Sequence, residues 1–409
     1  MNANVPDVII VGGGPAGSAT AWALARAGLD VRVLDRAQFP RSKPCAEYLN
    51  PAAVDALRTI GVLPAVIAAG ATPIHGMRVI AANGTALIGE FAGVAQRRTE
   101  SAHGLALRRE RLDALLLDAA RVAGATVRER THVIDLVAGD NARITGVRLA
   151  DGTIERAKLI IGADGLRSVV ARRLHLGGHA RWPRRMAFVA HYEGVRGMGS
   201  HGEMHVYANG YVGLAPVDAG LVNVAVVVPT RLARPAAGDA ARFLESWLAL
   251  RPRLVPRFVG ARRVDNARGI GPFAWSTRRA WAPGVALVGD AVEFFDPFTG
   301  EGMCSALRGG LMLAPHAQRA CGAEREQDER AALAAYDDER HRAFRGKWAV
   351  ERLVGAAVAW PPFLNRAARG LARRRDLADT FVGVTGEIIP ATSVLHPAYA
   401  VALARAAFT

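Results

Sequence analysis

Three glycines close to the N-terminus, Gly12, Gly14 and Gly17, have the spacing G-x-G-x-x-G. In this pattern the first glycine permits a tight turn, the second lets the backbone approach a pyrophosphate, and the third lets a helix pack closely on a strand. Asp35 follows about twenty residues later, where a carboxylate can accept hydrogen bonds from both hydroxyls of a ribose. These residue types at these spacings predict a dinucleotide-binding site.

The segments that carry these residues read as a strand, a helix and a second strand. Residues 7–11 form a short apolar run, typical of a parallel strand that is buried on both faces. A helix is predicted over residues 16–27 and ends at Gly28, and a second apolar strand over residues 31–34 leads directly into Asp35. Because the strand, the glycines, the helix, the second strand and the aspartate follow one another at the expected spacing, the glycines are interpreted as a phosphate-binding loop rather than an isolated turn.

Asp164 and Asp290 follow apolar strands in the same way as Asp35. Residues 159–163 and 287–289 are buried-strand patterns that end in small residues immediately before these two aspartates. Ligands of open α/β sheets bind at the carboxyl ends of the strands. We therefore expect the three aspartates to converge on one crevice.

Length, composition and cysteine content exclude several classes of protein. The chain has 409 residues, 51% of them hydrophobic, so it can bury a large core and is expected to form two or three domains. Its cysteines, Cys45, Cys304 and Cys321, are too few and too scattered for a disulfide framework or a metal site. The first predicted strand leaves no room for a signal peptide, and no apolar run is long enough to span a bilayer. We expect a cytoplasmic protein without a metal.

The formal net charge of +15 is the unusual feature of the composition. Arginines are concentrated at Arg366, Arg369, Arg373, Arg374 and Arg375, and their spacing places much of this charge on one helical face. Such a face is either simply solvated or a docking surface for an acidic carrier protein, a phospholipid headgroup or the phosphates of a reductant. A nucleic acid is not expected, because no aromatic or helix-turn-helix pattern accompanies the charge.

Residues 181–278 contain alternating runs separated by turn signals, which predict an antiparallel sheet inserted between two parts of the nucleotide-binding unit. The strand period of two places Glu203, His205 and Tyr207 on one face of this sheet and Met204 on the other. Either face could line a pocket. His205 and Tyr207 are therefore candidates for a catalytic acid or base, or members of a half-exposed sheet face.

The chain resembles the flavoprotein superfamily that contains class A aromatic hydroxylases, flavin-dependent halogenases and geranylgeranyl reductases. Three signatures carry this resemblance in the family order: the Gly12 motif, Gly-Ala-Asp-Gly at residues 162–165 and Gly289-Asp290. The resemblance implies FAD as the cofactor. It also implies an α/β fold, with a Rossmann-like FAD-binding domain, an inserted antiparallel substrate sheet and a C-terminal helical region.

The domain organisation expected from this resemblance has four segments. They are residues 1–180 and 279–325 for the two parts of the FAD-binding domain, 181–278 for the substrate sheet and 326–409 for a helical cap.

Two segments resemble the geranylgeranyl-reductase-like branch. Residues 39–49 resemble its P-R-x-K-P-C-G motif, with Ala46 where glycine is usual, and residues 296–303 resemble its D-P-F-T-G-E-G motif. The helix N-terminus that follows the second motif suits the flavin edge on which negative charge collects during reduction. In this branch the cysteine matched by Cys45 lies near the flavin ring, where it is either a proton donor or a compact buried side chain.

The resemblance also assigns individual contacts. Asp35 matches the position at the adenosine ribose, where the family more often has glutamate, Arg109 resembles the flavin-contacting arginine, and Asp290 matches the carboxylate on the ribityl chain. The residues expected to contact FAD are Gly12, Gly14, Pro15, Ala16, Gly17, Asp35, Arg36, Arg41, Cys45, Ala46, Arg109, Val133, Asp164, Gly165, Gly289, Asp290, Pro297, Gly300, Gly302 and Met303.

Several reactions compete within this superfamily. Halogenases carry a W-x-W-x-I-P motif and prenyl reductases a Y-x-W-x-F-P motif, but residues 211–216 read Tyr-Val-Gly-Leu-Ala-Pro, which lacks tryptophan and half matches the second. Monooxygenation through a flavin C4a-(hydro)peroxide needs no protein nucleophile, so the first expectation is hydroxylation of a hydrophobic aromatic, prenyl or polyketide-like substrate. The alternatives are reduction of a C=C bond, then halogenation, then a non-enzymatic electron carrier.

The partners expected from the sequence follow from these reactions. With no second dinucleotide fingerprint, NAD(P)H must visit transiently or a separate flavin reductase must supply electrons. The substrate is expected to be a hydrophobic small molecule, either free or tethered to an acidic carrier or another protein. Peripheral membrane contact through the basic surface is a further alternative, and the oligomeric state is left open.

Overall fold

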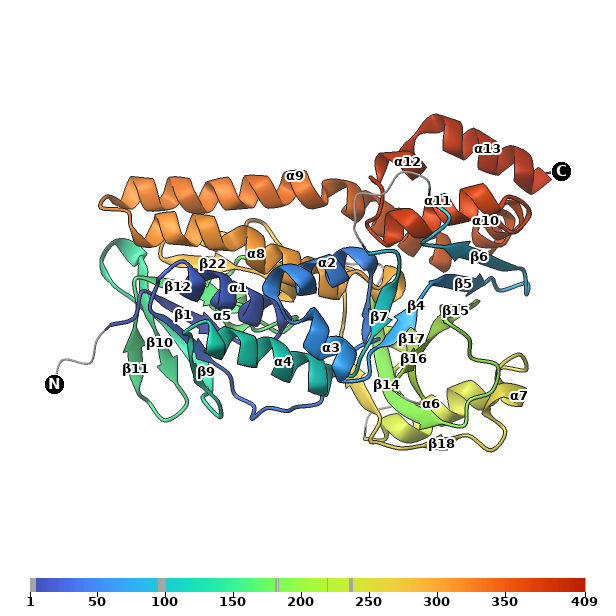
Figure 1. Ribbon diagram of the computed structural model, residues 1–409, viewed down its shortest axis with the longest axis horizontal. Coiled ribbons are helices and arrows are strands. Elements are labelled where there is room, and N and C mark those ends of the chain that lie inside the picture. The colour runs from blue at the N-terminus through green and yellow to red at the C-terminus, as the bar shows by residue number, and fades with distance from the viewer. Residues whose placement is uncertain are drawn as a thin grey trace.

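A parallel sheet forms the core of the structure, a computed structural model that describes residues 5–94, 101–180, 182, 184–218, 220–234 and 238–408 (Figure 1). The strand order is β21-β22-β12-β1-β2-β8, with β21 alone antiparallel to its neighbour. These strands are β21 (Trp281–Ala282), β22 (Val285–Leu287), β12 (Leu159–Gly162), β1 (Val8–Val11), β2 (Val31–Leu34) and β8 (Thr126–Arg128). Strand β1 is wholly buried, as its apolar sequence predicts.

Four helices pack beside this sheet. Helix α1 (Pro15–Arg26) contacts both α4 (Arg109–Val122) and α8 (Gly302–Cys321), and the long helix α9 (Glu326–Ala359) lies along α8 (Figure 1). A separate ribbon of β9 (Val133–Ala138), β10 (Ile144–Leu149) and β11 (Ile154–Arg156) extends from the same end of the molecule as the N-terminus.

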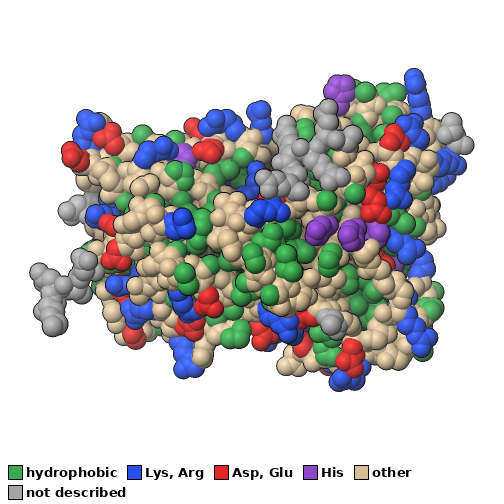
Figure 2. Space-filling view, viewed as in Figure 1, with side chains coloured by type: hydrophobic (Ala, Val, Ile, Leu, Met, Phe, Trp, Pro, Cys, Tyr) green, Lys and Arg blue, Asp and Glu red, His purple; other side chains and the backbone are tan. Residues whose placement is uncertain are grey.

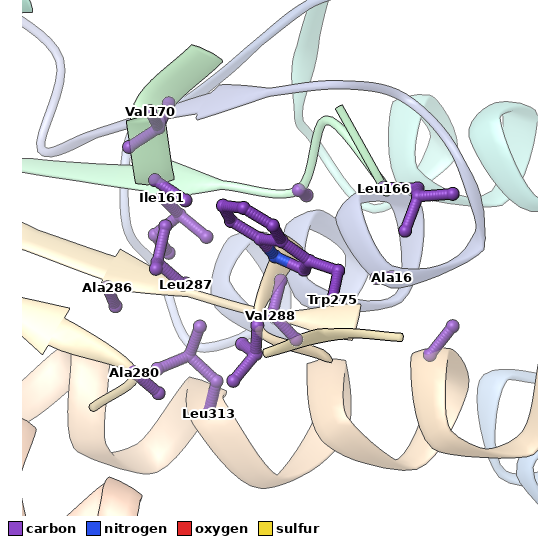
Figure 3. Packing of buried hydrophobic residues seen from close by; sticks show 14 of the residues in the cluster. Ala16, Ile161, Leu166, Val170, Trp275, Ala280, Ala286, Leu287, Val288 and Leu313 are labelled. Atoms are coloured by element: carbon purple, nitrogen blue, oxygen red, sulfur yellow. The ribbon is translucent and has the colours of Figure 1, made fainter. Parts of the chain in front are cut away.

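Apolar side chains fill the space between the sheet and α8 (Figure 3). Ile161 of β12, Leu287 of β22 and Leu313 of α8 are fully buried members of one cluster. Helix α1 crosses α8 so closely that a Cβ at Gly310 would lie 2.7 Å from the carbonyl oxygen of Ala16. Small residues at this crossing let the N-terminus of α1 lie next to the carboxyl ends of the strands.

A second, mostly antiparallel sheet lies beside the first. Its order is β18-β14-β17-β16-β15-β5-β6, with β19 also paired to β14. The strands are β18 (Arg262–Arg263), β14 (Arg185–Glu193), β17 (Leu221–Pro229), β16 (Gly210–Val217), β15 (His201–Tyr207), β5 (Gly76–Ile80), β6 (Ala86–Glu90) and β19 (Arg268–Ile270).

Strands β5 and β6 come from residues 76–90. These residues lie outside the segment 181–278 that was predicted to form this sheet. They join through a parallel pairing of β5 with β15, between segments more than a hundred residues apart. Local alternation predicts a strand but does not reveal such a distant partner.

The two faces of the antiparallel sheet have different neighbours. One face packs against helix α6 (Ala240–Ala249) in a cluster that includes Phe188, Val224 and Trp247. The alternate residues, such as Val189 and Ala225, face the parallel-sheet half of the molecule. The space between the two sheets is thus roofed by small and branched apolar side chains.

The C-terminal helices cover the far end of the antiparallel sheet. They are α10 (Pro361–Arg373), α11 (Arg375–Thr385), α12 (Thr392–Leu395) and α13 (Pro397–Phe408). Helices α10 and α11 contact β6. The predicted fold class, a Rossmann-like unit with an antiparallel sheet and C-terminal helices, is confirmed. Across the ranges that the structure describes, no helix is long and apolar enough to cross a bilayer.

The approach of α1 to β1 yields a test of the fold. Gly17 lies inside α1, where alanine is favoured over glycine by up to about 1 kcal/mol. A Cβ at Gly17, however, would lie 1.9 Å from the carbonyl oxygen of Gly12. We expect Gly17→Ala to lower the free energy of unfolding by about 1–3 kcal/mol, measured by thermal melting. Gly178→Ala is the matched control, because no atom of the described residues lies within 4 Å of its Cβ position. Melting of the Gly17 variant at or above the wild-type temperature would contradict the packing.

Candidate functional site

The glycine loop and Asp35 form one hydrogen-bonded unit. The Asp35 carboxylate accepts hydrogen bonds from the backbone N–H groups of Gly13 and Ala37, both at 2.8 Å. A cavity of about 640 Å³ lies beside this unit. The predicted residues that line it are Gly12, Gly14, Asp35, Arg36, Arg41, Val133 and Asp164.

Asp164 has one carboxylate oxygen without a partner. Its Oδ2 accepts a hydrogen bond of 2.6 Å from the backbone N–H of Val169, at the start of helix α5 (Val169–Arg173). Its Oδ1 is buried and has no hydrogen-bond partner within the described residues. Burial raises the pKa of this carboxyl group. Since a buried unsatisfied acceptor is costly, a ligand group that donates a hydrogen bond here would relieve that cost.

A second cavity, of about 140 Å³, continues from the first beneath the antiparallel sheet. The two share the lining residues Gly14, Lys43, Pro44, Ala163, Leu166 and Ile270. Other predicted residues line the second cavity: Pro15, Ala16, Cys45, Ala46, Arg109, Gly165, Asp290, Pro297, Gly300, Gly302 and Met303. The structure therefore brings Asp35, Asp164 and Asp290 to one continuous space.

Two of the predicted contact residues lie outside this space. Gly17 packs on the carbonyl of Gly12 and so has a structural role in the turn. Gly289 borders a separate cavity of about 130 Å³ behind Asp290, next to Lys347 of α9.

The loop that opens α8 is anchored to the antiparallel sheet. Asp296 Oδ1 accepts a hydrogen bond from the backbone N–H of Phe298 at 3.1 Å and another from the Tyr211 hydroxyl at 2.7 Å. Its other oxygen forms a buried ion pair with Arg185 at 2.5 Å. Gly300 adopts a φ of +71°, after which α8 begins at Gly302 with free backbone N–H groups toward the second cavity.

Charges of both signs surround the point where the cavities meet. Arg109 forms a bidentate ion pair with the fully buried Asp113, with both distances at 2.7 Å, and Arg41 pairs with the same carboxylate at 3.0 Å. Burial disfavours the charge on Arg109, but Asp113 and the Cys45 thiol outweigh it and raise the pKa of the guanidinium. Burial raises the pKa of Asp290, opposed chiefly by Lys43. A positive guanidinium is thus held at the cavity wall.

The Cys45 loop is fixed by a buried carboxylate. Glu47 has a φ of +60° and its side chain is buried. Its Oε1 accepts the backbone N–H of Arg109 at 2.8 Å, while its Oε2 accepts His191 Nε2 at 2.6 Å and Asn223 Nδ2 at 3.1 Å. Asn223 also donates to the carbonyl oxygen of Cys45 at 2.8 Å. These contacts hold Cys45 at the cavity wall.

His205 and Tyr207 lie on the face of the sheet that turns away from the cavity. His205 bonds to Glu203 at 2.8 Å, and Arg257 pairs with the same carboxylate. The ring of Tyr207 packs edge-on against Trp247. Met204, on the opposite face, lines the cavity instead. The geometry gives no support to a catalytic role for His205 or Tyr207.

The profile of the FAD binding domain family matches residues 6–350 of the chain. The chain belongs to this family of FAD-binding flavoproteins. FAD is therefore its cofactor, and the family is one of FAD-dependent oxidoreductases, as the resemblance in the sequence implied.

Curated relatives are similar over most of the chain. The menaquinone reductase of Mycolicibacterium smegmatis is 33% identical over 320 residues, which cover 75% of each chain. Digeranylgeranylglycerophospholipid reductase 2 of Methanopyrus kandleri is 30% identical over 393 residues, which cover 93% of each chain.

Solved structures share the fold at lower identity. A triple mutant of the flavin-dependent brominase Bmp2 superposes with a TM-score of 0.81 at 21% identity and covers 97% of each chain. PqsL of Pseudomonas aeruginosa in complex with 2-aminobenzoylacetate superposes with a TM-score of 0.73 at 23% identity, over 88% of this flavoprotein and 99% of PqsL. At these identities the similarity establishes the fold alone.

The described residues fit FAD. A Cβ at Gly14 would meet only the Arg41 guanidinium, at 3.5 Å, so the space above the glycine is open to a pyrophosphate. Asp164 offers an unsatisfied acceptor, and Asp35 lies where the adenosine ribose is expected. The N-terminus of α8 supplies N–H groups and a positive dipole end for the flavin ring.

Sequence reasoning missed several residues of the site. Lys43 and Glu47 stand inside the cysteine motif, which was the available signal for them. His191 and Asn223 are paired directly across strands β14 and β17, and Asp113 lies one helical turn after Arg109. Glu47, His191, Asn223 and Asp113 position the loop and the guanidinium, whereas Lys43 lines the cavities.

A substitution at Gly14 distinguishes a loss of FAD binding from a loss of folding. Gly14→Val should leave the thermal midpoint of the FAD-free protein close to that of the wild type, because the new side chain enters open space. It should abolish FAD retention, since that space is the approach path of the pyrophosphate. The measurement is the ratio of flavin to protein absorbance after purification, with Gly178→Val as the control. Full flavin content in the Gly14 variant would refute the assignment.

His191 makes stability depend on pH. Burial disfavours its imidazolium, but hydrogen bonds to Asp265 and Glu47 outweigh burial and raise the pKa of His191 from its ordinary 6.5 to about 9. A raised pKa in the folded state stabilises the fold below the unfolded value, and this contribution is lost as the pH rises through the folded value.

We expect the wild type to lose up to about 3 kcal/mol of stability between pH 6.5 and 9 through this group. His191→Gln should flatten the dependence of the thermal midpoint on pH in that window. An unchanged slope in the His191 variant would contradict the hydrogen bonds of His191 to Asp265 and Glu47.

Proposed function

We propose that this flavoprotein reduces a carbon–carbon double bond in a hydrophobic, isoprenoid-type substrate. The observation that carries the proposal is the Cys45 thiol on the wall of an apolar cavity, held in place by Asn223 and Glu47. Saturation of a double bond requires a proton donor beside the substrate, whereas oxygen transfer from a reduced flavin does not require a thiol.

The names of the relatives support the same reaction class. Two relatives with at least 30% identity are a menaquinone reductase and a digeranylgeranylglycerophospholipid reductase, and both named molecules carry isoprenoid chains. The two alignments cover 75% and 93% of the chain. Reduction was the alternative that the sequence left open.

The cavity wall suits a hydrocarbon chain. Met204, Val189 and Val227 face it from the sheet, and a Cβ at Gly213 would first meet Met204 Sδ at 3.4 Å. The absence of a side chain at Gly213 leaves space next to that methionine. Such a wall excludes water, which favours binding of apolar groups and protects a reactive centre from side reactions.

The cofactor and the residues at the cavity wall have separate roles in this reaction. FAD, when bound in its reduced form, would supply a hydride to one carbon of the double bond. Cys45 donates a proton to the other carbon, so that the substrate gains two hydrogens and a thiolate is left. The Arg109 guanidinium beside the sulfur stabilises this negative charge, and a proton from solvent restores the thiol. NAD(P)H, visiting transiently, or a separate flavin reductase returns the electrons.

Hydroxylation, the first expectation from the sequence, stays a prediction. It requires molecular oxygen and gives Cys45 no chemical role. Halogenation and electron transfer alone are likewise supported by no observation at this site, because the halogenase structures are similar at a level that establishes only the fold.

Cys45 variants test the proposal under anaerobic conditions. Menaquinone and a digeranylgeranyl phospholipid serve as probes, and reduced FAD is generated chemically. Cys45→Ala should lower product formation by about a hundredfold, the usual cost of losing a general acid, while flavin content is unchanged. Cys321→Ala, at the far end of α8, is the matched control. Unchanged turnover of the Cys45 variant, or product formed only with oxygen, would overturn the proposal.

A further inference from the structure

Two aromatic rings project from the turn between α9 and α10. Trp360 is 64% exposed and Phe363 is 44% exposed. The rings stack on each other, with centroids 5.9 Å apart and planes inclined by 12°. Exposing a large apolar surface to water is costly, so exposed apolar side chains that gather in one place mark a candidate contact site.

Helix α10 continues this surface with positive charge. Its buried side, which includes Ala368 and Leu371, packs toward α13 and the sheet. Its outer side carries Arg366, Arg369 and Arg373, and its sequence contains no acidic residue. The charges on this side are therefore not balanced within the helix.

The C-terminal end of α13 adds a third ring to the same surface. The Arg366 guanidinium lies 5.0 Å from the ring centroid of Phe408, whose side chain is 73% exposed. Lys and Arg side chains mark the end of the molecule where α10 and α13 lie (Figures 1 and 2). We call Trp360, Phe363, Arg366, Arg369 and Phe408 the α10 surface.

We propose that the α10 surface docks the flavoprotein on an anionic phospholipid membrane. Aromatic rings prefer the boundary between headgroups and acyl chains, and arginines beside them attract the phosphates of the headgroups. An acidic protein would pair with the arginines but would leave the exposed rings without an apolar environment. A membrane interface satisfies both groups at once.

The C-terminal helices also pack against a residue of the candidate site. Val382 of α11 shares a buried cluster with Tyr48, and Tyr48 lines the apolar cavity. The inference goes beyond the proposed reduction and does not depend on it, because binding to vesicles is measured without any substrate.

Vesicle sedimentation of the FAD-loaded full-length protein tests the proposal. Phosphatidylcholine vesicles are compared with vesicles that also contain phosphatidylglycerol. The wild type should bind the anionic vesicles and not the neutral ones. Arg366→Gln with Arg369→Gln should weaken binding by about 25-fold, since each arginine at such a surface contributes about fivefold. Trp360→Ser with Phe363→Ser should weaken it at least about tenfold.

Matched controls separate this surface from the overall positive charge. Arg172→Gln with Arg231→Gln removes two exposed arginines elsewhere, and Val122→Ser with Leu250→Ser removes two exposed apolar side chains. Both control variants should bind within about twofold of the wild type. Equal losses in the control and α10 variants would overturn the proposal, because binding would then reflect net charge alone.

A second measurement keeps the proposal testable if a variant misfolds. Lipids brominated near the headgroup should quench part of the tryptophan fluorescence of the bound wild type. Trp360→Phe, which preserves an aromatic ring, should lose that quenching while binding remains. Quenching that persists in Trp360→Phe, or no binding of the wild type to anionic vesicles, would refute docking through this surface.

Discussion

The position of the candidate site depends on one buried carboxylate. Glu47 bonds to the backbone of Arg109, to His191 and to Asn223, which belong to three segments far apart in the sequence. The carboxylate thus joins the Cys45 loop, the start of α4 and two strands of the antiparallel sheet. A buried carboxylate with these partners is costly to disturb, because loss of one partner leaves an uncompensated charge. The left-handed backbone at Glu47 persists because its side chain is held in this way.

A second polar connection acts at the other side of the cavity. Asp296 joins the loop before α8 to Arg185 and Tyr211 of the antiparallel sheet. The Cys45 loop and the loop before α8 are therefore each joined to the antiparallel sheet by directional hydrogen bonds. Directional contacts fix distance and angle more narrowly than apolar packing does, and the space between them can remain open for a cofactor and a hydrophobic substrate. Small apolar residues of the roof then define the shape of that space.

The sequence was sufficient for the local parts of the structure. The strand, glycine loop and helix that end at Asp35 were predictable because neighbouring residues determine them. Strands β5 and β6 were not assigned to the antiparallel sheet, since their pairing with β15 joins distant segments. The strand period of two correctly placed Met204 and His205 on opposite faces of the antiparallel sheet. It does not reveal which of these faces lines the cavity. The contacts of Glu47 could not be predicted either, because its partners lie far from it in the sequence.

The proposed reduction requires Cys45 to protonate a substrate carbon inside a cavity shaped by these connections. The most direct measurement is an anaerobic reaction in deuterated water with a menaquinone or geranylgeranyl probe, followed by mass spectrometry and NMR of the product. We expect a product that has gained two hydrogens, with solvent deuterium at both carbons because the thiol and the N5–H of reduced flavin both exchange with solvent, and we expect its formation to be about a hundredfold slower in Cys45→Ala. A product that carries an oxygen atom from molecular oxygen, and that forms only when oxygen is present, would contradict the proposed reduction.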